Sequence, residues 1–339
     1  MITNNKLTVD EAVGIFYSMN KLPDFIDQYD KNFVDLKDKV HKWIDQFENK
    51  HQEMFLTLFS QLKYFDTINI KKWFKEAYNE YLCIESSHDE SIFMPITSTG
   101  GIMNGAVHIL SEFDSAGLNI SRKKVAAQPV EFNNSFKMDN AKNIVLLDDI
   151  IGSGDTLLDF ILSCLDNEHT KKIFHNKKVY IFCLVVTERA KVNVENVLEY
   201  MGYECCFISK FTIDKALKQG VIFADKSELA EVKKVVKKYE QKAASEDKFI
   251  MGYKDSQALI SFHFNTPNNT FSTFWESCEV KPWFSVFPRR KDEIEFELKK
   301  EEQVRLQHIK DERKRIKKEI SNIKEQIENE KKKRLGDTK

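Results

Sequence analysis

Two adjacent carboxylates and a glycine-rich loop follow each other closely near the middle of the chain. Asp148 and Asp149 come directly after an apolar run at residues 144–147. The loop that follows contains Gly152, Ser153, Gly154, Asp155 and Thr156. Carboxylates accept hydrogen bonds from a vicinal diol or bind Mg²⁺, and the backbone N–H groups of a tight glycine turn surround an anion. These residue types at this spacing predict a site that binds a sugar together with its phosphate.

The elements on either side must position this segment. The run at 144–147 is short, unbroken and rich in β-branched residues, which is typical of a parallel strand buried on both faces, and we expect it to end at Asp148. Beyond the loop, apolar residues at 157, 158, 160, 161 and 165 have the spacing of one helix face. The start of a helix attracts anions because its first amides are unpaired and its dipole is positive there. The plainer alternative is a buried strand with capping aspartates.

The segment resembles the phosphoribosyl-pyrophosphate (PRPP) motif of type I phosphoribosyltransferases: four apolar residues, two aspartates, two apolar residues and a phosphate loop. This resemblance implies a Rossmann-like α/β fold with a parallel sheet and chemistry at C1 of the ribose. It implies that Asp148 and Asp149 are catalytic, face the ribose hydroxyls and bind Mg²⁺ as a cofactor. It also implies that the loop at 152–156 binds the 5′-phosphate.

Two residues depart from the motif. Gly152 stands where purine-specific members have an aspartate that assists the base, and glycine has no side chain for that task. Asp155 is an unusual neighbour for a phosphate dianion, because like charges repel. We therefore expect the Asp155 carboxylate to point away, with only its amide facing the anion. PRPP binding is better supported than any particular transfer reaction.

A second strand, loop and helix unit precedes the central one, with a strand at 91–97 and a helix at 102–116. The resemblance places pyrophosphate at the loop between them, whose candidate binding residues are Ser98, Thr99, Gly100 and Gly101. Typical members have a Lys or Arg in or beside that loop, and this chain has none there. Mg²⁺ or the basic run Arg122, Lys123 and Lys124 would have to neutralise the pyrophosphate. The alternative is a turn that only connects strand to helix.

Arg189 is the candidate cationic residue of the site. It follows the apolar strand at 178–186, and ligands gather at the carboxyl ends of strands in open α/β sheets. An exposed arginine at a helix start is the alternative. A helix at 192–201 and a strand at 204–208 follow, and residues 119–142 have the place of a mobile loop in type I enzymes.

The flanking regions predict three parts. Residues 1–88 have helical spacing throughout and form an N-terminal helical region. Residues 89–290 form the phosphoribosyltransferase-like α/β domain, with an accessory segment at 210–290 that is helical and charged up to residue 247 and has a strand at 259–264. Residues 291–339 form a long charged helix.

A narrower resemblance covers residues 40–290. Its signatures are Trp-Ile-x-Gln-Phe at 43–47, Thr-Pro-Asn-Asn-Thr at 266–270 and Trp-x-x-x-x-Pro-Arg at 283–289. They look like the phosphoribosyltransferase-like family of bacterial conflict (anti-phage defence) systems, which implies an effector or nucleotide-processing component. Aromatic residues and a basic pair near the last two signatures could stack a base, or could form a buried aromatic plug: Phe271, Phe274, Trp275, Trp283, Arg289 and Arg290.

The long helix at 291–335 has no Gly or Pro, and its apolar residues fall on a and d positions of heptads interrupted by Arg313. These residues are Leu306, Ile309, Ile316, Ile320, Ile323 and Ile327. We expect a coiled coil that forms a homo-oligomer or binds a partner protein through 291–335. The basic residues at 310, 313, 314, 315, 317 and 318 could contact nucleic acid, but a solvated coiled-coil face is favoured.

Composition indicates a globular protein, with 42% hydrophobic residues. The formal net charge of −1 argues against nucleic-acid binding by the whole chain. There is no apolar run long enough for a membrane span and no signal peptide, so we expect no membrane partner and a cytoplasmic location. Six cysteines without a Cys-x-x-Cys pair favour buried reduced thiols over a zinc or redox site.

The sequence thus predicts a phosphoribosyltransferase-like effector that binds Mg-PRPP or a related ribose phosphate or nucleotide. The alternative is a non-catalytic sensor that keeps the pocket and signals through its C-terminal helix. A scaffold with a degenerate pocket would bind no PRPP.

Overall fold

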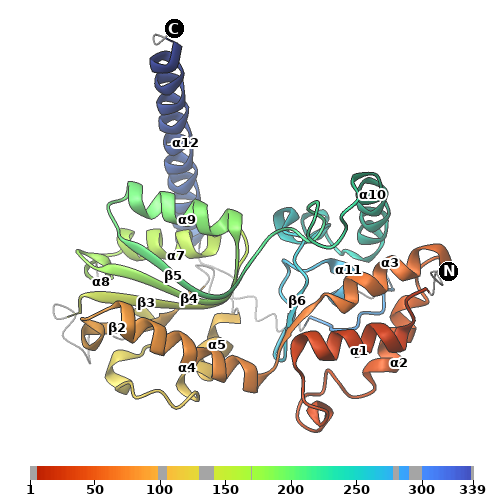
Figure 1. The fold of residues 1–339 in the computed structure, drawn as a ribbon. Coiled ribbons are helices and arrows are strands. Elements are labelled where there is room, and N and C mark those ends of the chain that lie inside the picture. Colours follow the sequence, from red (N-terminus) through yellow and green to blue (C-terminus); the bar gives the residue numbers. More distant parts are fainter. Residues whose placement is uncertain are drawn as a thin grey trace. The chain divides into compact units, whose positions relative to one another are not determined.

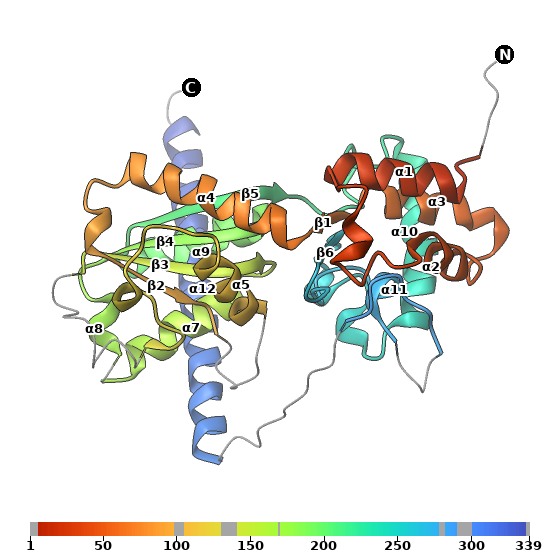
Figure 2. The ribbon, with the colours of Figure 1, turned by 90° about the horizontal axis from the view of Figure 1, so that it is seen from below.

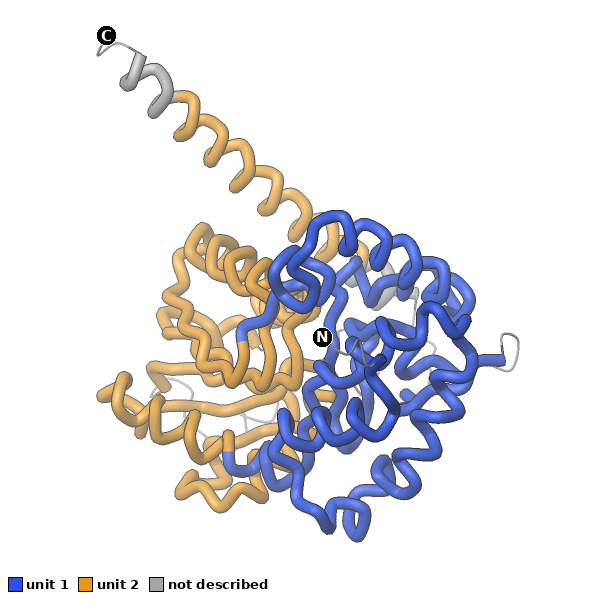
Figure 3. The backbone as a smooth tube through the Cα atoms, turned by 45° about the vertical axis from the view of Figure 1, so that its right-hand side comes forward, with its two compact units in different colours: residues 1–72, 212–292 blue, residues 73–211, 293–339 orange. Residues whose placement is uncertain are grey.

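A computed structural model of the chain describes residues 6–97, 105–129, 141–168, 170–277, 282–289 and 300–336. Contacts between Cα atoms divide the chain into two compact units, one formed by 1–72 and 212–292 and the other by 73–211 and 293–339 (Figure 3). Residues 210–290 were expected to be an accessory segment of the α/β domain, whereas these contacts group 212–292 with the N-terminal helices. One sequence alone does not show which distant segments touch.

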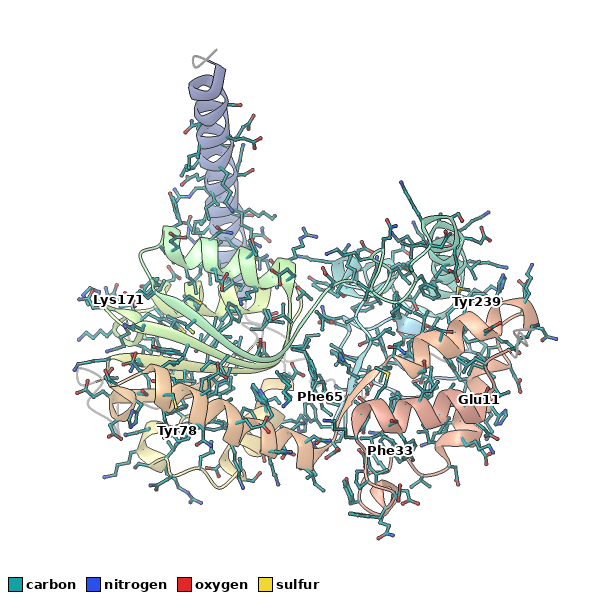
Figure 4. The ribbon with its side chains drawn as sticks, in the orientation of Figure 1. Glu11, Phe33, Phe65, Tyr78, Lys171 and Tyr239 are labelled. Carbon is teal, nitrogen blue, oxygen red and sulfur yellow. The ribbon has the colours of Figure 1, made fainter. Side chains whose placement is uncertain are left out.

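The first unit is helical around an aromatic core, with one small sheet. Its elements are α1 (Val9–Asn20), α2 (Leu36–Ile44), α3 (Asn49–Ser60), β1 (Lys63–Phe65), α10 (Lys226–Ala243), β6 (Ile260–Phe262) and α11 (Ser272–Trp275). Thr8 and Glu11 form a capping box that begins α1. Phe33 and Tyr239, labelled in Figure 4, are both buried in this core.

Two stretches of this unit differ from the sequence expectation. Residues 63–65 lie within the region expected to be all helical, yet they form β1, which pairs in parallel with β6. A three-residue strand has too little pattern to be recognised without its distant partner. The segment 210–247 is not helical throughout either, because a strand, β5 (Cys205–Ile213), extends into it and the helix α10 begins only at Lys226.

The aromatic residues near the end of this unit are structural. Phe271, Phe274 and Trp275 are fully or almost fully buried. The indole N–H groups of Trp43 and Trp283 both donate to the Thr273 carbonyl oxygen, at 2.7 and 2.9 Å. Rings enclosed in this way offer no face to a base. The prediction that these three residues stack on a base is therefore wrong, and the alternative of a buried aromatic plug is confirmed.

The second unit is an α/β domain whose sheet has the strand order β2-β3-β4-β5. Its elements are β2 (Ser91–Pro95), α5 (Gly105–Asp114), β3 (Asn143–Ile151), α7 (Asp155–Asp166), α8 (Lys171–Phe174), β4 (Lys178–Thr187), α9 (Glu188–Tyr200) and α12 (Lys300–Gly336). α4 (Thr67–Ile84) and β5 cross the boundary between the units. β3 pairs in parallel with both β2 and β4. α7 and α9 cover one face of the sheet, and α4 and α5 cover the other (Figures 1 and 2). The expected α/β class with parallel sheets, helical N-terminal region and long C-terminal helix is confirmed.

β3 is the central strand that carries the acidic pair. Residues 144–147 are completely buried, as the unbroken apolar run predicts. The strand does not end at Asp148, because Ile150 and Ile151 still pair with Val185 and Val186 of β4. β2, in contrast, ends at Pro95, opposite Leu147. The two aspartates therefore lie just beyond the end of β2.

The first part of α12 packs against the second unit, and its second part is exposed. Ile309 and Ile316 are 3% and 5% exposed and belong to the core that α7 and α9 share. Ile323 and Ile327 are 42% and 48% exposed. The first part of the heptad stripe is thus used inside the second unit, and a coiled coil with another chain stays a prediction for the second part. Among the described residues, no helix has the length and apolar character that a membrane span requires.

Candidate functional site

Asp148 and Asp149 point to opposite faces of the sheet, because side chains alternate along a strand. Asp148 lies opposite Cys183 in the β4 register and is only 6% exposed. Its Oδ1 accepts the Asp149 N–H at 2.9 Å. Burial, and next the nearby charge of Asp149, raise the pKa of Asp148 well above its ordinary value. This carboxyl therefore favours its neutral form.

Asp149 is more exposed than Asp148 and lies against the first residue of α5. A Cβ atom added to Gly105 would stand 2.0 Å from Asp149 Oδ2. Only a glycine at this position lets the helix start approach the carboxylate so closely. The positive end of the α5 dipole is then directed at a negative side chain. Gly105 thus places Asp149 between the sheet and the helix.

The phosphate-type loop is held by its carbonyl groups. Thr187 Oγ1 donates to the Gly152 carbonyl oxygen at 2.6 Å, and Asn193 Nδ2 donates to that of Ser153 at 3.5 Å. Gly154 has a left-handed φ of +77°, and an added Cβ would meet Val194 of α9 at 2.6 Å. Glycine is therefore required at 154 for both conformation and space.

The amides of this loop are available as donors. Within the described ranges, no hydrogen bond engages the backbone N–H groups of Gly154, Thr156 and Leu157 at the start of α7. Unpaired amides at a helix N-terminus form an anion site, since they point at the ligand and share the positive helix end. The loop thus has the donors that a phosphate needs.

Asp155 directs its carboxylate away from those amides, towards α12. Its Oδ1 lies 2.8 Å from Lys317 Nζ and 3.5 Å from Arg313 Nη1. Its own N–H donates to Ser153 Oγ at 3.3 Å. The Asp155 amide is therefore engaged by a side chain of the same loop.

The other site residues expected from the sequence have different outcomes. Ser98, Thr99, Gly100 and Gly101 lie outside the described residues. Lys124 Nζ donates to the carbonyl oxygen of Asp89, which directly precedes β2. Lys124 is therefore held at the amino ends of the strands, whereas the two aspartates lie at the carboxyl end of β2. Arg189 is exposed in the first turn of α9 and is close enough to Lys317 to contribute to lowering its pKa. Arg189 therefore lies on the α12 side of the loop.

The described ranges contain no group of three or more His, Cys, Asp or Glu side chains arranged to hold a metal ion. Mg²⁺ is usually held by one or two carboxylates together with substrate phosphates and water. Asp148 and Asp149 fit that donor set. A bound divalent cation would also favour the ionised form of Asp148, against the effect of burial.

Several residues that support the site from other elements could not be identified from the sequence. These residues are Gly105, Asn193 and Lys317. Each contacts a site residue that is far from it in the sequence, so no local spacing indicates its role. Arg313 did have a signal. It interrupts the apolar stripe of α12, and a cation on a buried helix face needs a partner.

The site combines a central parallel strand, an acidic pair at the point where the neighbouring strand ends, and a loop of unpaired amides. These are features of an α/β protein of the phosphoribosyltransferase type. The model of the PRTase-CE family matches residues 40–289, and the chain belongs to this family. The resemblance to phosphoribosyltransferases is thus confirmed at the level of the family. No curated protein and no solved structure matched the chain.

Proposed function

We propose that this chain binds a ribose phosphate, Mg-PRPP or a related nucleotide, at the carboxyl edge of its sheet and acts at C1 of the ribose. The observation that carries the proposal is the set of unpaired amides at the start of α7, next to the acidic pair. Family membership supports a single ligand for these two features, because a ribose phosphate has both an anion and a diol.

The residues have distinct tasks in this proposal. The amides of Gly154, Thr156 and Leu157 donate to the 5′-phosphate. Asp148 and Asp149 accept hydrogen bonds from the ribose hydroxyls and stabilise the positive charge that develops on the sugar when the bond at C1 breaks. Arg189 supplies positive charge beside the loop. Mg²⁺, held by the aspartates, would neutralise the diphosphate.

The direct test is calorimetric titration of PRPP in the presence of Mg²⁺. Asp148→Asn combined with Asp149→Asn is expected to weaken binding at least ~100-fold, since each lost hydrogen bond to a charged group costs about 1.5 to 3 kcal/mol. The melting temperature should not fall, because the variant removes a buried carboxyl and keeps its shape. Asp24→Asn with Asp27→Asn, the same pair of substitutions at exposed positions of the other unit, is the matched control. Unchanged PRPP affinity in the double variant would contradict the proposal.

Mg²⁺ removal gives a second test of the same site. Chelation should weaken PRPP binding more than ribose 5-phosphate binding, because only PRPP has a diphosphate for the cation to bridge. The comparison is made by titrating both ligands with and without a chelator. Equal effects on the two ligands would contradict a Mg²⁺ ion that bridges the diphosphate.

A non-catalytic sensor is the second candidate, and Gly152 favours it. A glycine at this position has no side chain to assist a leaving or entering base. Pyrophosphate release in the presence of PRPP and varied acceptors separates the two functions. Binding without release supports the sensor, and release supports the transferase.

We also propose that the chain acts as an effector in an anti-phage defence system, as the signatures at 43–47, 266–270 and 283–289 imply. Bacteria that express the chain with its neighbouring genes should resist phage, and the double aspartate variant should remove that resistance. Equal plating of phage with and without the intact genes would contradict the defence role and leave ligand binding as a separate result.

A further inference from the structure

We propose that the C-terminal helix α12 is a functional part of the phosphate loop. In this proposal, Arg313 and Lys317 hold the Asp155 carboxylate away from the loop amides, and the loop keeps its anion-binding conformation only while they do so. The inference rests on the proposed ribose-phosphate site for its ligand, but the contact between α12 and α7 can be tested without that ligand.

The contact is short and largely buried. Arg313 is 8% exposed although it is an arginine, and its Nη1 donates to the Asp155 carbonyl oxygen at 3.0 Å and to Asp159 Oδ2 at 2.7 Å. Lys317 Nζ lies 2.8 Å from Asp155 Oδ1. Two cations of α12 therefore meet two carboxylates of α7 at the point where the loop becomes a helix.

The charges explain why the loop needs this contact. Asp155 is the first residue of α7, directly after Gly154, so its carboxylate is attached to the same turn whose amides would bind phosphate. A free carboxylate at that place repels an incoming dianion and competes with it for the same amides. Burial and the nearby Arg313 lower the pKa of Lys317 to about 8, so Lys317 still carries its charge for the most part at neutral pH.

Apolar packing also holds α12 against the domain, so the effect of the charges can be tested by itself. Ile309 and Ile316 pack in the core beside α7 and α9, and Tyr200 donates to Glu319. Apolar contacts of this kind persist when a neighbouring lysine loses its charge. Figure 1 shows α12 passing α7 and α9 before it leaves the domain.

The experiment uses the full chain, ribose 5-phosphate as the probe and Lys317→Met as the main variant. We expect this variant to lower ribose 5-phosphate affinity about tenfold or more. Lys314→Met is the matched control, because Lys314 is exposed on the same helix and pairs only with Asp311 of that helix among the described residues. Adding Asp155→Asn to Lys317→Met should restore affinity to within about threefold of the wild type, since no carboxylate then needs neutralising. Lys317→Gln replaces Lys317→Met if the latter does not fold.

Amide hydrogen exchange of the ligand-free proteins tests the contact without any ligand. The Leu158 amide, which donates to the Gly154 carbonyl oxygen at 3.0 Å, should exchange faster in Lys317→Met than in Lys314→Met, while the second half of α7 stays the same. Equal exchange in the two variants overturns the inference, as does lowered affinity that Asp155→Asn fails to restore. If the wild type binds no ribose 5-phosphate, the proposed function fails, and the exchange comparison alone decides whether α12 holds the loop.

Discussion

At the scale of single residues, the site depends on a close approach between a carboxylate and a glycine. Asp148 and Asp149 face different layers of the second unit, so they can meet one ligand only where the sheet opens beyond the end of β2. Gly105 lets α5 come against Asp149 at that opening. The orientation of Asp149 is therefore set by a residue far from it in the sequence.

Gly105→Ala should move the Asp149 carboxylate while leaving the fold intact. The new methyl group would stand 2.0 Å from Asp149 Oδ2, which lies at the end of a flexible side chain and can rotate away. We expect PRPP affinity to fall about tenfold, the cost of one weakened hydrogen bond to a charged group. Calorimetry and thermal melting measure the two effects.

Gly14→Ala is the control for that variant. Gly14 lies inside α1, and nothing stands within 4 Å of an added Cβ. Alanine there should stabilise the first unit by about 0.5 to 1 kcal/mol without changing PRPP affinity. A Gly105→Ala variant that binds PRPP like the wild type would show that the position of Asp149 is not important for the ligand.

The acidic pair and the loop could be placed together from the sequence because they are contiguous in the chain. Charge alone predicted that the Asp155 carboxylate points away from the anion, and its contacts with Arg313 and Lys317 show where it goes. The supporting roles of Gly105, Asn193 and Lys317 could not be predicted. Their contacts depend on how helices pack, and a single sequence contains no direct signal of that packing.

At the scale of elements, a buried carboxylate joins α10 to the start of α11. Glu240 of α10 is completely buried, and its carboxylate accepts the backbone N–H groups of Met251, Ser272 and Thr273 at 2.8 to 3.0 Å. Burial outweighs these hydrogen bonds and raises the pKa of Glu240 to about 7. The carboxyl group is therefore easier to bury when it is protonated.

This raised pKa predicts that the first unit loses stability as pH rises. The contribution of Glu240 is fully present below its unfolded pKa of about 4.5 and is lost as pH rises through about 7, at a cost on the order of 3 kcal/mol. Melting temperatures at pH about 5 and about 8 should differ more in the wild type than in Glu240→Gln. Glu231→Gln, an exposed glutamate on the same helix, should keep the wild-type difference. Identical pH profiles for Glu240→Gln and the wild type would refute this assignment.

Elements with a strong pattern were predicted well and short ones were not. The unbroken apolar runs at 144–147 and 178–186 correspond to β3 and β4, and the long charged segment corresponds to α12. β1 was missed because three residues carry no period. β5 was cut short because Lys210 and other polar residues along its second half resemble a solvated helix.

At the scale of the whole molecule, the two parts of α12 have different surroundings. Its first part contributes Arg313 and Lys317 to the loop, and its second part exposes Ile323 and Ile327. We propose that a second copy of the chain covers these two isoleucines, because they continue the same heptad stripe. The contact is short, so we expect an association that depends on protein concentration.

Ile327→Lys should abolish that association. The substitution puts a charge on the seam, and sedimentation velocity across a concentration series should show only monomer. Ile68→Lys, at an exposed isoleucine of α4, should sediment like the wild type. A wild-type chain that is monomeric at every concentration would contradict the proposed association.

The central claim is that a ribose phosphate binds with its anion at the start of α7 and its hydroxyls at the acidic pair. A crystal structure of the chain with ribose 5-phosphate tests it most directly. We expect the phosphate oxygens within about 3 Å of the Thr156 and Leu157 amide nitrogens and the sugar hydroxyls beside Asp149. Sugar phosphate bound elsewhere, or a loop left without ligand at saturating concentration, would contradict the claim.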